Sequence, residues 1–166
     1  MVVHGAESAS AFRDFFESEY ERMFHTLFLT CGNREEAEDL TQEAMARAFE
    51  HWDRVRAAQS PARYVYKIAF NLLRRRRQRA ALGRLLLRRE VEREDSIAKV
   101  ERRAGIVEVL LELPLGQREA LVLVDWWGMS STEAGRILGI KPASVRSRLH
   151  RGRTALRKLL GGEDDA

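Results

Sequence analysis

The stretch that decides the fold is SSTEAGRILGIKPASVRSRLHRGRTALRKLL, residues 130 to 160. Its start has the S-x-x-E spacing of a capping box, in which the Ser130 side chain caps a free backbone N–H and Glu133 reaches back. Gly139 can take the left-handed conformation that ends a helix, and Pro142 suits the first turn of the next one. The stretch therefore predicts two short helices around a tight turn, a helix–turn–helix.

The second of these helices is strongly basic, with seven lysines and arginines and no acid between residues 141 and 160. On a helical wheel Val145 and Leu149 fall on the side that must face the core. The opposite side of the helix, together with the positions next to it, could enter a major groove, where an arginine fork matches guanine. Its side chains are those of Arg146, Ser147, His150 and Arg151. Four of the other bases better suit phosphates: Arg148, Arg153, Arg157 and Lys158. The alternative interpretation is a solvated basic helix of a bundle.

Charge is unevenly distributed over the 166 residues, whose net charge is +4. Residues 1–53 carry a net charge of −8 and residues 63–93 a net charge of +9. This separation predicts two different partners, of which one is anionic. The single cysteine, Cys31, excludes an internal disulfide and fits a reducing compartment. No signal peptide and no apolar run of the roughly 20 residues that a membrane span needs is visible, so we expect a cytoplasmic protein.

Apolar residues recur at helical spacing through most of the chain, which predicts an all-α fold of two small domains joined by a charged linker. The first domain, 10–80, is expected to be a bundle with helices over 10–30, 34–52 and 61–80 and a loop over 55–61. Residues 1–9 are expected to be disordered, and 81–103 to form a linker with partial helicity. The second domain, 104–162, adds helices over 105–113 and 117–127 before the helix–turn–helix.

Two polar faces of the first domain are not explained by capping or solubility alone. On the helix 34–52, the side chains of Asp39, Gln42 and Glu43 lie beyond the first turn, where acids complement the helix dipole. On the helix 61–80, an aromatic, an amide and basic side chains share a face that suits unpaired bases and phosphates; they are Tyr64, Lys67, Asn71, Arg74 and Arg75. The alternative for this second face is an interhelical tyrosine beside a solvated charge run.

The order of motifs resembles the extracytoplasmic-function sigma factors, the two-domain members of the sigma-70 family of bacterial RNA polymerase. AEDLTQEAMARAF (37–49) looks like the family's region 2.2, and YVYKIAFN (64–71) looks like its regions 2.3–2.4. LPLGQREALVL (113–123) and ASVRSRLHRGRTALR (143–157) look like region 4. Each motif is weak by itself, but four in this order and at these separations are a specific signal.

The resemblance implies a sigma factor, which is not an enzyme and needs no metal or cofactor. Its partners would be core RNA polymerase (β′ clamp helices and β flap), promoter DNA and, in many relatives, an anti-sigma factor. Contact with the polymerase would fall to Asp39, Leu40, Gln42 and Glu43. The −10 element would be bound by the loop from Arg56 to Ser60 and then by Tyr64, Lys67, Asn71, Arg74 and Arg75. The −35 element would be read by Arg146, Ser147, His150 and Arg151.

The chain departs from the family pattern at a few positions. Tyr64 stands where tryptophan is usual, so less area is left for stacking. The loop 55–60 lacks the glycine and acid often found there. Gly135 replaces an alanine and costs its helix up to about 1 kcal/mol of propensity. Lys141 stands where a capping serine is common, which weakens the start of the last helix.

Two other classes of function compete with a sigma factor. A stand-alone helix–turn–helix repressor or activator would explain the second domain, but it leaves the helix 34–52 and the arginine cluster 74–79 without a role. A hydrolase or nuclease is disfavoured because the four histidines are far apart, with no H-x-x-x-H spacing, no paired carboxylates and no P-loop.

Overall fold

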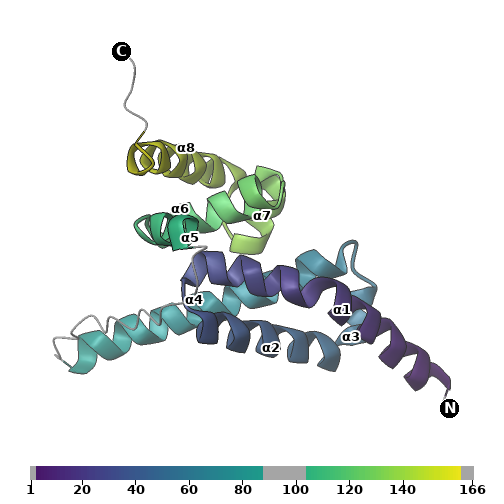
Figure 1. Ribbon diagram of the computed structural model, residues 1–166. Helices are drawn as coiled ribbons and strands as arrows, with labels where there is room; N and C mark the ends of the chain where they lie inside the picture. The colour runs from purple at the N-terminus through teal and green to yellow at the C-terminus, as the bar shows by residue number, and fades with distance from the viewer. Residues whose placement is uncertain (1–2, 88–103, 162–166) are drawn as a thin grey trace.

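The computed structural model describes residues 3–87 and 104–161, and every regular element within these two ranges is a helix. The first domain contains α1 (Val3–Cys31), α2 (Arg34–Glu50), α3 (Trp52–Arg56) and α4 (Pro61–Leu87). The second contains α5 (Ala104–Leu111), α6 (Leu115–Leu121), a π-helical turn η1 (Val122–Trp126), α7 (Ser131–Leu138) and α8 (Pro142–Leu159). The two groups of helices can be followed in Figure 1. The prediction of an all-α fold is confirmed.

The first domain is a bundle in which α2 packs against both α1 and α4. Its core is filled by large side chains without exposed surface, among them Met23, Leu27, Leu40 and Phe70. Gly32 adopts a φ of +75° between α1 and α2, a conformation that glycine takes without strain. Asn33 then caps α2, because its side-chain oxygen accepts from the backbone N–H of Glu36 at 2.9 Å, as its position predicts.

The second domain contains the predicted helix–turn–helix. Both halves of the capping box are present: the Glu133 N–H donates to Ser130 Oγ at 3.2 Å, and the Ser130 N–H donates to Glu133 Oε2 at 2.8 Å. Gly139 ends α7 with a φ of +68°. Lys141 makes no side-chain capping bond, so α8 depends for its start on the preset backbone of Pro142.

Several element boundaries differ from the sequence prediction, and three of the differences change how a segment is interpreted. α1 begins at Val3, so the expectation of disorder before residue 10 is wrong from Val3 onward. The expected loop 55–61 begins later, because the chain re-forms a helical turn as α3 and inserts the buried Trp52 between Phe12 and Phe15, each with its ring centroid 5.2 Å from that of Trp52. α4 continues to Leu87, into the stretch predicted as a partly helical linker, and the rest of that linker lies outside the described residues.

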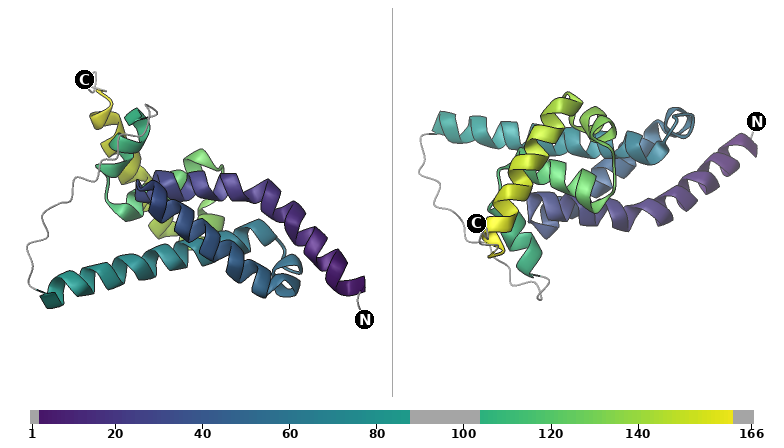
Figure 2. Two further views of the ribbon diagram at one scale, coloured as in Figure 1. Left: turned by 60° about the horizontal axis from the view of Figure 1, so that its bottom comes forward. Right: turned by 90° about the horizontal axis from the view of Figure 1, so that it is seen from above.

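The two domains pack directly against each other. α1 contacts α5, α6 and η1, while α4 contacts α7. Seen from above in Figure 2, α7 and α8 lie over α1 and α4, and the far end of α4 projects beyond the second domain. The buried apolar residues of both domains belong to one connected cluster. The sequence did not predict this arrangement.

Gly135 supplies a test of how tightly the helix–turn–helix is packed. A Cβ at this position would lie 2.7 Å from the carbonyl oxygen of Ile140, which is backbone and cannot rotate away. We therefore expect Gly135→Ala to lower the free energy of unfolding by about 1–3 kcal/mol, although alanine is the better helix former. Urea unfolding measures the change.

The matched control is Gly83→Ala in α4, where a Cβ would meet nothing within 4 Å. There the propensity term acts alone, and we expect stability to be unchanged or raised by up to about 1 kcal/mol. Stabilisation by alanine at both glycines would contradict the close approach at Gly135.

Candidate nucleic-acid and partner interfaces

The outward side of α8 is a continuous polar face. The four side chains predicted to read DNA are all exposed on it: Arg146, Ser147, His150 and Arg151. The opposite side is buried through Val145, Leu149 and Gly152. Arg151 Nη2 donates to Ser147 Oγ at 3.0 Å, which holds this guanidinium along the helix surface. The structure thus brings the predicted readers together on one accessible face.

Two other arginines of α8 are held by acids of the same domain. Arg153 makes a bidentate pair with Asp125, with N–O distances of 2.9 and 2.6 Å, and this carboxylate raises the pKa of Arg153. Arg148 lies 3.8 Å from the carboxylate of Glu119. Both had been assigned to phosphates from the wheel alone. No sequence pattern indicates these pairs, because the acids lie on other helices.

The acidic face of α2 is present and mostly accessible. Asp39 and Gln42 are exposed and Glu43 is half-buried, whereas the Leu40 side chain is in the core with 0% exposed. Leu40 therefore anchors α2 against the rest of the bundle. The three polar side chains are the part of this predicted site that a partner can reach.

The four consecutive arginines of α4 point to different places. Arg76 lies between two acids of α2, 3.7 Å from Asp39 and 3.4 Å from Glu43, and Arg77 lies 3.1 Å from Glu36. Arg75 is exposed. Half of the run thus binds the acidic helix of its own domain. This division follows from the packing of α2 against α4, which the sequence alone does not give.

The remaining residues predicted for DNA lie on α3, on α4 and between them. Arg56 ends α3 and pairs with Asp53 at 2.9 Å, while Ser60 Oγ accepts from the Arg63 N–H at 3.4 Å at the start of α4. Along α4, Lys67 and Arg75 are exposed, and three other predicted residues are half-buried: Tyr64, Asn71 and Arg74. Arg74 donates to the backbone carbonyl of Leu138 in the second domain.

A buried charged pair that the sequence did not single out lies in α6. Burial raises the pKa of Glu119, and the arginines Arg74 and Arg148 oppose this shift. Burial likewise lowers the pKa of the neighbouring Arg118. Because Arg74 belongs to the first domain, arginines of both domains lower the pKa of Glu119 against the effect of burial.

Comparison with known proteins identifies the family. Residues 15–82 match the family "Sigma-70 region 2" and residues 103–156 match "Sigma-70, region 4". The chain is 30% identical over 162 residues to the ECF RNA polymerase sigma factor SigM of Mycobacterium tuberculosis, covering 97% of this chain and 83% of SigM. It belongs to the extracytoplasmic-function (ECF) sigma factors. SigW of Bacillus subtilis, another ECF RNA polymerase sigma factor, is 31% identical, over 90% of this chain and 89% of SigW.

Two solved sigma factor structures share the fold of this ECF sigma factor. RpoE of Bartonella quintana, in complex with the anti-sigma factor NepR, superimposes with a TM-score of 0.76 over 94% of this chain and 99% of RpoE, at 19% identity. CnrH, in complex with the cytosolic domain of CnrY, gives a TM-score of 0.64 over 96% of each chain, at 22% identity. Both matches span the two domains of this sigma factor.

Two classes of site are not found in the described part of the chain. Residues 3–87 and 104–161 contain no group of three or more histidine, cysteine or acidic side chains that could hold a metal ion. No helix within these ranges is long and apolar enough to cross a membrane.

The division of the arginine run can be tested on stability. We expect Arg76→Ala to lower the free energy of unfolding by about 0.5–1 kcal/mol, because it leaves Asp39 and Glu43 next to each other without a countercharge. Arg75→Ala, the neighbouring exposed position, is the control and should change stability by less. Chemical denaturation measures the free energy of unfolding of both variants. An equal decrease for Arg75→Ala and Arg76→Ala would contradict the pairing of Arg76 with the acids of α2.

Proposed function

We propose that this ECF sigma factor brings core RNA polymerase to promoters through its first domain and reads the −35 element through its second. The observation that carries the proposal is that one chain holds both sigma-70 regions, each with an accessible charged face of its own. The proposed division is 10–80 for polymerase and the −10 element, 81–103 for the linker and 104–162 for the −35 element. The protein would act in the cytoplasm as a binding factor and not as an enzyme.

The proposed polymerase contact is the acidic face of α2. Asp39, Gln42 and Glu43 would meet the β′ clamp helices, with Leu40 holding α2 in place from the core side. Arg76 supports this role because it contacts both acids from α4 and limits the positions that their carboxylates can take. A basic group of a protein partner would either replace Arg76 at these two carboxylates or bind them together with Arg76.

The proposed −10 contact runs from Arg56 and Ser60 along the helix α4. Tyr64 would stack on an unpaired base, and Lys67, Asn71, Arg74 and Arg75 would bind the strand and its phosphates. Capture of flipped bases offsets an unstacking cost of a few kcal/mol, so opening would need no nucleotide hydrolysis. The recognition face of α8 would contact the −35 duplex through Arg146, Ser147, His150 and Arg151.

Polymerase would also fix the distance between the two DNA contacts. Once both domains are docked, on the β′ clamp helices and on the β flap, the second DNA contact becomes intramolecular and its effective concentration rises. An anti-sigma factor completes the set of partners proposed for this chain.

A stand-alone helix–turn–helix regulator fits the second domain but not the first. The match to region 2 over residues 15–82 and the acidic face of α2 have no part in such a function. Run-off transcription with core polymerase on genomic fragments distinguishes a sigma factor from a stand-alone regulator. A sigma factor should produce selective starts that share −35 and −10 elements, whereas a regulator should protect an operator without polymerase and give no such starts.

The recognition face can be tested at single residues. We expect Arg146→Ala and Arg151→Ala each to reduce promoter-specific transcription roughly five- to 150-fold, since a good base contact is worth about 1–3 kcal/mol. Arg157→Ala, an exposed arginine near the end of α8, serves as the control. It should weaken binding to all sequences alike. Normal initiation by both recognition-helix variants from the native promoter would refute the assignment.

The acidic face can be tested by charge reversal. We expect Asp39→Arg with Glu43→Arg to abolish co-purification with core polymerase without loss of helix content, because the face then repels a basic partner. Glu35→Arg with Glu50→Arg changes the charge of α2 by the same amount at exposed positions outside the proposed contact, and should leave association largely intact. Undiminished association of the Asp39/Glu43 variant would rule out the proposed contact.

A further inference from the structure

The recognition helix α8 is joined to its own domain by a narrow apolar stripe. Of its 18 residues only three are buried, namely Val145, Leu149 and Gly152, and the third has no side chain. A Cβ at Gly152 would lie 3.0 Å from Leu121 Cδ1, so glycine is what lets α6 approach α8 this closely. A stripe this narrow holds α8 against α6 but leaves the rotation of α8 about its own axis to be fixed by other contacts.

Two arginines flank this stripe, and each lies next to an acid of an adjacent element. Arg148 and Arg153 are five residues apart, which places them about 140° apart around the helix, on opposite sides of the stripe. Arg153 binds Asp125 of η1 through two N–H···O bonds of 2.9 and 2.6 Å. Arg148 lies 3.8 Å from the buried carboxylate of Glu119, and its guanidinium covers Gly116 of α6. Ion pairs therefore hold α8 on both sides of its apolar contact.

The pair of Asp125 with Arg153 is the more constraining of the two. The side chains are partly open to water, with exposures of 39% and 48%, and ion pairs of this kind matter chiefly when their geometry is bidentate, as it is here. Two parallel bonds fix the plane of the guanidinium as well as its distance. The carboxylate also takes up Nε and Nη2, the fork that a phosphate would bind. Arg153 is therefore engaged within its own domain.

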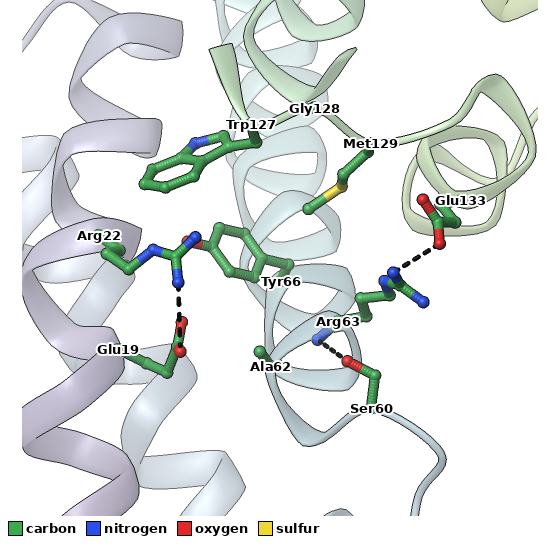
Figure 3. Close-up of a pocket in the computed structure, with 10 residues that line it drawn as sticks. All are labelled: Glu19, Arg22, Ser60, Ala62, Arg63, Tyr66, Trp127, Gly128, Met129 and Glu133. Atoms are coloured by element: carbon green, nitrogen blue, oxygen red, sulfur yellow. Dashed lines mark hydrogen bonds and ion pairs between the residues drawn. The ribbon is translucent and has the colours of Figure 1, made fainter. Parts of the chain in front are cut away.

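The element that carries Asp125 is itself anchored. Val122 and Leu123 of η1 are buried in the second domain. Trp127, which directly follows η1, has its ring centroid 4.5 Å from the guanidinium of Arg22, and Figure 3 shows these two side chains next to Tyr66. π-helical turns are rare and occur frequently at functional sites. Asp125 is thus presented to α8 from a fixed position.

The rotation of α8 determines where its recognition face points. Side chains of one helix keep fixed directions relative to one another, so a rotation turns all four predicted readers together: Arg146, Ser147, His150 and Arg151. Since a helix with its side chains is about 10–12 Å across, a rotation of about 10° moves a side chain at its surface by about 1 Å. A displacement of this size is enough to weaken a hydrogen bond to a base edge.

We propose that Asp125 is a positioning residue for promoter recognition: by binding Arg153 with both carboxylate oxygens, it sets the rotation of α8 and thereby directs the base-reading side chains. Arg153 then orients α8 and does not bind the phosphates to which the helical wheel assigns it. Both partners belong to the second domain, so the pair does not depend on what the first domain contacts. The inference rests on the proposed function, because it takes the exposed face of α8 as the reader of the −35 element.

The variants remove the pair from either side. Asp125→Ala and Arg153→Ala each remove one partner, the double variant removes both, and Asp125→Glu keeps a carboxylate on a longer side chain. Glu112→Ala, at an exposed position just after α5, removes the same charge as Asp125→Ala and is its matched control. Arg157→Ala is the matched control for Arg153→Ala, at another exposed arginine of α8. Circular dichroism verifies the helix content of each full-length variant.

The first measurement is −35 discrimination by core polymerase carrying each full-length variant. Discrimination is the run-off transcription from the native promoter divided by that from the same promoter with a scrambled −35 element. Loss of folded protein cancels in this ratio, so a merely structural role of the pair would leave it unchanged. We expect Asp125→Ala and Arg153→Ala each to lower the ratio about five- to tenfold, the lower part of the range for one base contact.

The remaining variants test whether the two residues act as one unit. The double variant should lower discrimination no further than either single variant does, because the same interaction is lost in all three. Asp125→Glu should stay within about twofold of wild type, since the carboxylate is kept. Glu112→Ala should match wild type. If Asp125→Ala does not fold, Arg153→Ala, at an exposed position of α8, provides both measurements.

The second measurement asks, without polymerase, whether Arg153 binds phosphate. Binding of the full-length chain to a labelled mixed-sequence duplex is followed by fluorescence anisotropy at a series of salt concentrations. Each phosphate contact contributes about 0.9 to the slope of log K against log salt concentration. We expect Arg153→Ala to leave this slope unchanged and Arg157→Ala to reduce its magnitude by about 0.9.

A phosphate-binding role for Arg153 predicts the opposite pattern. Arg153→Ala would then reduce the slope by about 0.9, and transcription from both promoters would fall alike, so the ratio would not change. Either result would overturn the proposal, as would equal discrimination by Asp125→Ala and Glu112→Ala. An absence of selective starts with the wild-type chain would instead refute the proposed function. Selective starts with the wild type, together with unchanged discrimination in the variants, would refute only the positioning role of Asp125.

Discussion

The arrangement of this ECF sigma factor depends on one constraint, which is that α1 has to bury apolar surface toward both domains. α1 packs on α2, α3 and α4 and also on α5, α6 and η1. Its hydroxyl side chains make this close approach feasible: Thr26 and Thr30 are fully buried, and each donates to the carbonyl four residues earlier at 2.7 Å, so neither hydroxyl is left unpaired. Because α1 packs on both domains, they share a single core. α1 also holds the second domain close to the first, which allows α4 to contact α7.

Local chemistry was sufficient to predict the helices, and long-range packing was not accessible from the sequence. The cap at Ser130 and the helix-ending glycine at position 139 act within a few residues of the chain, which is why they were predicted correctly. The position of α3 depends on Trp52 meeting Phe12 and Phe15, residues that lie about forty positions earlier in the chain. The hydrophobic periodicity of a short stretch of sequence does not reveal contacts with residues so far away in the chain.

The charged surfaces likewise combine features that the sequence predicts with features that depend on long-range packing. The recognition face of α8 could be predicted, because a helical wheel needs only the register of one helix. The arginines of α4 could not be assigned, because their partners lie on α2 and on the second domain. One run of like charges therefore has three environments: Arg74 contacts Leu138, Arg75 is exposed, and Arg76 and Arg77 pair with acids of α2. A basic run in a sequence is thus not by itself a map of a nucleic-acid surface.

The two carboxylate oxygens of Glu133 bind different partners. Oε2 accepts from the Ser130 N–H and closes the capping box, while Oε1 pairs with Arg63 of the other domain. Separation of the domains would leave the first bond untouched, so the start of α7 does not have to melt when Arg63 departs. The first turn of α7 is therefore stabilised from within its own domain, whatever Arg63 contacts. Loss of the ion pair alone would cost an interdomain contact without costing the helix its start.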